Sequence, residues 1–80
     1  MERDEISQLV CEIISKREHK EITESTTIAS IGSDAIRLRT YWLDVSAELS
    51  HQGIELNGNP GDFNSLKSVK EIVDHVAENI

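Results

Sequence analysis

The sequence has few cysteine, proline and aromatic residues, and these shortages exclude or disfavour some classes of protein. Cys11 is the only cysteine, so no disulfide can form within the chain, and a reducing cytoplasm fits this usage. Pro60 is the only proline, and the aromatic residues are Tyr41, Trp42 and Phe63 alone. Such a low aromatic content is unusual for a β-sandwich and ordinary for a small, aliphatic, helical protein.

Long apolar runs and positive charge are scarce as well. No apolar run approaches the length of a membrane span, and the opening residues M-E-R-D-E-I lack the apolar segment of a signal peptide.

The chain has 8 Lys and Arg against 15 Asp and Glu, a net charge of -7. An acidic surface repels phosphate backbones and anionic lipids, so we expect no nucleic-acid or membrane partner. A partner with a basic docking face is the more natural expectation.

Residues for catalysis or metal binding are sparse. His19, His51 and His75 are isolated, and none has ligand spacing with Cys11 or with another histidine. The sequence contains no nucleophile with a matching base and acid, no P-loop and no G-x-G-x-x-G motif. We therefore expect neither an enzyme nor a metal site, and we expect the Cys11 thiol to be half-buried and inert.

What the chain does have is helical periodicity. Its 80 residues are enough for one domain, residues 1–80, with no second core. Apolar residues recur at helical spacing in residues 3–17, and again from residue 34 to about residue 51. A third periodic stretch predicts a last helix, with Ser65 as its N-cap.

Two connections separate these helices. Residues 18–33 are polar and β-branched, and we expect an ordered loop held over the bundle by Ile22, Ile28, Ala29 and Ile31. Residues 53–64 are rich in glycine and predict a loop with one helical turn. The predicted fold is all-α: a four-helix bundle of three long helices and one short helix, with a long first loop.

The stretch I-G-S-D-A-I, residues 31–36, marks the start of the second long helix. Gly32 allows a turn, and Asp34 is the expected N-cap, with Ser33 as the competing cap. Gly53 is expected to end this helix. Its inward face is predicted from apolar spacing to be Ile36, Trp42, Val45 and Leu49, with Leu38, Tyr41 and Leu43 on the flanks.

Four features follow one another along the chain: the stretch I-G-S-D-A-I, a helix, the segment Q-G-I-E-L and a final helix S-L-K-S-V-K-E-I-V-D-H-V. This order resembles the acyl and peptidyl carrier proteins along nearly the whole chain. In that family a serine at the start of the second helix carries a 4′-phosphopantetheine arm, which holds acyl or aminoacyl intermediates. Gly32, Ser33, Asp34 and Ile36 match the family pattern, and Ala35 stands in place of the serine. The resemblance thus makes Ala35 the attachment position, with Asp34 and Gly32 shaping it.

Alanine has no hydroxyl, so this chain cannot hold the arm at position 35. Two explanations are open: a deliberate Ser-to-Ala variant that keeps a carrier protein unmodified, or a natural member that has lost its attachment site. Ser33 is a displaced acceptor only if the family order is broken, because in the family Asp directly precedes the serine. We interpret Ser33 as a loop or cap residue.

The resemblance also implies partners: a phosphopantetheinyl transferase and acyl- or aminoacyl-transferring and condensing enzymes, met by a monomer. The partner-binding candidates on the second helix are Ile36, Arg37, Arg39 and Leu43. Charge on this helix is nearly balanced, which favours a polyketide or nonribosomal-peptide pathway over fatty-acid synthesis. An inward-packed Ile36 and a merely solvated helix face stay open as alternatives. So does a helical protein-interaction module with no covalent cargo.

Overall fold

The computed structural model describes all 80 residues, and its secondary structure is helical throughout. No strand is present; Thr27 and Ser68 form an isolated antiparallel bridge. The all-α prediction is therefore confirmed. The elements in chain order are α1 (Arg3–Glu18), α2 (Ile28–Ile31), α3 (Ala35–His51), the 3-10 helix η1 (Pro60–Ser65) and α4 (Val69–Glu78).

Helix α1 has the predicted bounds to within one residue. It begins with a capping box at the N-cap Glu2, whose backbone N–H donates to Oε1 of Glu5 at 3.0 Å. It ends where His19 adopts a left-handed φ of 55°. Its buried stripe, at i, i+4 and i+8, is Ile6, Val10 and Ile14.

The connection from α1 to α3 is ordered, as predicted, and it contains the short helix α2. Ile22, Ile28 and Ile31 are buried and hold the connection against the core. Ala29 was expected to join them, but it is exposed, because α2 turns only its two isoleucines inward.

Helix α3 is the longest element, with 17 residues, and it supplies five of the buried side chains. The predicted inward face is wrong at Ile36, which is 76% exposed. Leu38 and Tyr41, expected on the flanks, belong to the core instead. The helix is rotated so that the buried stripe consists of Leu38, Tyr41, Trp42, Val45 and Leu49.

Helix α4 begins later than predicted. Ser65 ends η1, and the N-cap is Ser68, whose side chain accepts from the N–H of Glu71. The cause is non-local: the N–H of Ile28 donates to the Lys67 carbonyl and the N–H of Val69 to the Thr26 carbonyl, each at 2.9 Å. This pairing keeps residues 66–68 extended, so the helix can start only after it.

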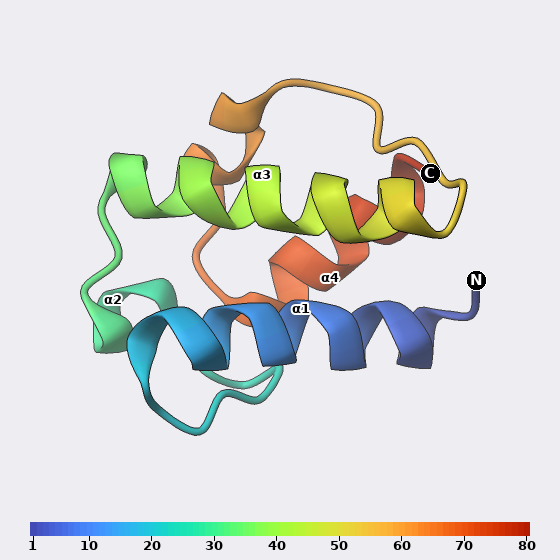
Figure 1. Ribbon diagram of the computed structural model, residues 1–80. Helices are drawn as coiled ribbons and strands as arrows, with labels where there is room; N and C mark the ends of the chain where they lie inside the picture. The colour runs from blue at the N-terminus through green and yellow to red at the C-terminus, as the bar shows by residue number, and fades with distance from the viewer.

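The long helices α1 and α3 lie side by side and run in opposite directions, while α4 crosses behind them and contacts α1 (Figure 1). Helix η1 packs against α3. The core contains no charged residue. The end of α1, helix α2 and the start of α3 meet at one end of the molecule, which therefore holds the candidate site (Figure 1). None of the helices combines the length and the apolar composition that crossing a bilayer requires.

Candidate functional site at the start of α3

The turn between α2 and α3 is made by Gly32. Its φ is 64°, and its N–H donates to the Ala29 carbonyl at 3.2 Å while the N–H of Ser33 donates to the Ile28 carbonyl at 3.3 Å. No atom lies within 4 Å of the place where a Cβ would stand. Gly32 is therefore required by its left-handed backbone and not by lack of space.

Asp34 caps α3, as predicted. Its Oδ1 accepts from the N–H of Arg37 at 2.9 Å, and its carbonyl accepts from the N–H of Leu38 at 3.0 Å. Ala35 is the first residue of the helix, and it is exposed. A side chain at position 35 therefore leaves the protein at the surface, beside the positive end of the helix dipole.

A hydrogen-bond network anchors this junction to α1. The Tyr41 hydroxyl donates to Oε2 of Glu18 at 2.6 Å, and Nη1 of Arg37 pairs with Oε1 of Glu18 at 2.9 Å. The Ser33 hydroxyl lies 2.7 Å from that of Tyr41. Because the single phenol proton goes to Glu18, Ser33 is the donor to Tyr41. The Ser33 hydroxyl is thus directed into the protein, which supports its interpretation as a structural loop residue.

The network also governs the ionisation of Tyr41. Burial, followed by the hydrogen bond to the Glu18 carboxylate, raises the pKa of Tyr41 to about 12. Sequence reasoning missed this network, because Glu18 and Tyr41 lie far apart in the chain and no short motif contains both. The one available signal was a tyrosine among the apolar positions of α3, since a buried phenol requires a partner.

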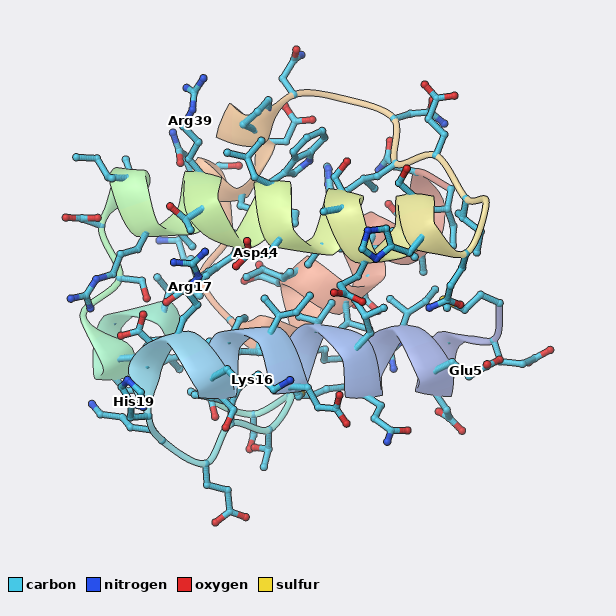
Figure 2. All side chains as sticks on the ribbon, viewed as in Figure 1. Glu5, Lys16, Arg17, His19, Arg39 and Asp44 are labelled. Carbon is cyan, nitrogen blue, oxygen red and sulfur yellow. The ribbon has the colours of Figure 1, made fainter.

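The four partner-binding candidates occupy different positions on α3. Ile36 and Leu43 are 76% and 49% exposed, so both present apolar surface to solvent. Arg39 is exposed and its side chain points away from the bundle (Figure 2). Arg37 lies on the side facing α1, where it pairs with Glu18. Ile36, Arg39 and Leu43 are thus the candidates that remain free.

A groove of about 730 Å³ lies elsewhere, between α1 and α3. It contains none of the predicted site residues. The ion pair of Arg17 and Asp44, at 2.7 Å, lies at this groove and bridges the two helices (Figure 2). The apolar residues that line it are Met1, Leu9, Ile13 and Ala47.

The side chains that commonly bind metals are not clustered elsewhere in the fold. No group of three or more His, Cys, Asp or Glu side chains is placed to hold a metal ion. Cys11 is partly buried, and burial raises the pKa of its thiol, which disfavours the reactive thiolate.

The chemistry that the start of α3 offers is the presentation of one exposed side chain, at position 35, on a capped helix end. Alanine gives that position no reactive atom.

Comparisons with known proteins add no relative: no family model, no curated protein and no solved structure matches the chain.

Proposed function

We propose that this protein is an acyl or peptidyl carrier domain whose attachment position is occupied by Ala35. The observation that carries the proposal is the start of α3, where the pattern Gly32, Ser33, Asp34 and Ile36 surrounds an exposed first helical residue. The capping Asp34 and the Ser33–Tyr41–Glu18 network hold this start in one orientation. A tether fastened there would have free space outside the helix.

The wider fold supports the same proposal. Helices α1, α3 and α4, an ordered first connection that contains α2, and the 3-10 helix η1 before α4 are compatible with a bundle of acyl-carrier type. The acidic composition, with a net charge of -7, fits the resemblance as well. The arm itself does not fit the chain as it stands, because the Ala35 methyl offers no oxygen for a phosphodiester. The proposal therefore concerns either a Ser-to-Ala form of an active carrier or a natural member without its attachment site.

In the serine form, the proposed partners are a phosphopantetheinyl transferase and acyl- or aminoacyl-transferring and condensing enzymes. The proposed pathway is of the polyketide or nonribosomal-peptide type. What supports this is that two of the three carboxylates of α3 are engaged within the protein: Asp34 serves as a cap and Asp44 pairs with Arg17, while Glu48 is exposed. The proposed state is a monomer in the cytoplasm.

The test is to restore the hydroxyl. Ala35→Ser is incubated with coenzyme A and a broad-specificity phosphopantetheinyl transferase, and the intact mass is measured. We expect a gain of one phosphopantetheinyl group in this variant and none in the unaltered chain. A folded variant that gains no mass contradicts the carrier function.

One observation favours a second candidate, a helical interaction module without cargo. Ile36 and Leu43 expose apolar surface next to a position that cannot be modified, and exposed apolar side chains that gather on one face indicate protein contacts. The same mass measurement separates the two candidates, because an interaction module gains no mass when the serine is introduced.

A further inference from the structure

The exposed side of α3 next to position 35 has a distinctive charge. Ile36, Arg39 and Leu43, spaced i, i+3 and i+7, share one side of the helix, which we name the outward face. Its two apolar members are well exposed, and Arg39 forms no ion pair or hydrogen bond with any other side chain. Its side chain extends into solvent (Figure 2).

The carboxylates of the same helix are directed elsewhere. Asp34 folds onto the N–H of Arg37 as a cap. Asp44 lies on the side facing α1, where both of its oxygens accept from Arg17 at 2.7 and 3.1 Å (Figure 2). Glu48 lines the groove between α1 and α3. The outward face therefore carries one unpaired positive charge and no negative one.

The positive charge of Arg39 on the outward face is opposite in sign to the net charge of the whole molecule, which is -7. Exposed charges separated by more than a Debye length, about 8 Å at physiological ionic strength, are largely screened. A partner docked on the outward face would therefore respond chiefly to Arg39 and less to the distant carboxylates. Apolar flanks would also exclude water from a pair formed there and strengthen it.

We propose that the protein that docks beside position 35 presents an apolar surface bearing a carboxylate, which pairs with Arg39. The guanidinium offers a planar fork of donors that suits a carboxylate in two parallel hydrogen bonds. Ile36 and Leu43 flank this pair and contact the apolar part of the partner. The proposal rests on the proposed carrier function, and it reverses the basic partner surface that the net charge alone suggests.

Ala35 makes the test direct, because the unaltered chain can dock on a transferase without reacting. Binding of the chain to a phosphopantetheinyl transferase with coenzyme A is measured by calorimetry for the unaltered protein, Arg39→Glu and Arg39→Lys. Lys16→Glu is the matched control: it makes the same charge change on α1, away from the outward face (Figure 2). Thermal melts establish that each variant is folded.

We expect Arg39→Glu to weaken binding about tenfold or more, because a like charge replaces the attractive one. Arg39→Lys keeps the charge and should weaken binding by less, and Lys16→Glu should change the dissociation constant by less than about twofold. Tighter binding by Arg39→Glu, or an effect no larger than that of the control, overturns this inference and leaves the carrier function intact. No binding by the unaltered chain, together with no modification of Ala35→Ser, overturns the carrier function and this inference with it.

Discussion

At the scale of single residues, Tyr41 connects the segments around position 35. It lies within α3, and its hydroxyl meets both Glu18 at the end of α1 and Ser33 in the turn before α3. The Glu18 side chain is only 9% exposed, so its carboxylate depends on protein donors in place of water. Tyr41 therefore contributes both packing and a required donor.

The first prediction concerns this donor. Tyr41→Phe should lower the free energy of unfolding by about 1–2 kcal/mol, because a partly desolvated carboxylate loses one of its hydrogen bonds. Urea unfolding followed by the fluorescence of Trp42, the only tryptophan, measures the change. Ser33→Ala is the control, and it should cost less, since it removes only a neutral pair. An equal or smaller loss in Tyr41→Phe contradicts the assigned hydrogen-bond directions.

The second prediction is a titration. Tyr41 is the only tyrosine, so phenolate absorbance reports this group alone. Its pKa is raised from 10.0 to about 12, so the network's contribution to stability is complete below pH 10 and is lost as the pH rises towards 12. We expect an absorbance midpoint well above 10 in the folded protein, and a lower midpoint in Glu18→Gln. A midpoint at the ordinary value would show that the phenol is not buried against Glu18.

At the scale of elements, the start of α3 depends on its cap. Asp34→Ala should destabilise the protein by about 1 kcal/mol, because the N–H of Arg37 loses its acceptor, while Asp34→Asn should retain most of the stability. Thermal unfolding and amide exchange at Arg37 measure the effect. Asp4→Ala, in the first turn of α1, removes a carboxylate that caps nothing and should cost only a few tenths of a kcal/mol. Equal losses in the two alanine variants would contradict the cap.

The elements themselves could largely be predicted from local patterns. The stripe of α1, the cap Asp34 and the glycine after α3 are signals contained within a few residues, and all three agree with the structure. The start of α4 could not be predicted in this way. Ser65 and Ser68 both precede apolar residues, and only the pairing with residues 26–28 decides between them.

The residues of the candidate site likewise differ in whether a local sequence pattern could predict their positions. The exposed Ala35 at the first position of α3 follows from the cap one residue earlier, so its place was predictable. The orientation of Ile36 was not, because an isoleucine in the first turn fits an inward or an outward face until the rotation of the helix is known. The pairing of Arg37 with Glu18 depends on how α1 and α3 meet, which no local pattern contains.

At the scale of the whole molecule, Arg3 joins α1, the first connection and α4. Its guanidinium donates to Glu24 and to Asp74, each at a shortest distance of 2.7 Å, and Ser7 also donates to Glu24. Arg3 with Ser7 lowers the pKa of Glu24, and Lys70 with Arg3 lowers the pKa of Asp74. The stability that these pairs give is present above the ordinary pKa values of 4.5 and 3.8, and it is lost as the pH falls below them.

Arg3→Met should therefore make the free energy of unfolding depend less on pH in the acidic range. The unaltered protein is expected to lose stability as the pH falls below about 4.5, and the variant should start less stable at neutral pH and lose less over this acidic range. Urea midpoints across the range measure the difference. Arg39→Met is the control, because Arg39 has no carboxylate partner and its removal should leave the slope unchanged. Equal slopes for the two variants would contradict the network.

The most direct measurement of the central claim locates the modification in the chain. Ala35→Ser is treated with the transferase and coenzyme A, and peptide mass spectrometry identifies the altered residue. We expect one arm at position 35 and no arm on Ser33. The free energy of unfolding should stay within about 0.5 kcal/mol of that of the unaltered chain, because an exposed first helical position accepts either residue. A stable, folded variant that stays unmodified, or an arm found on Ser33, would contradict it.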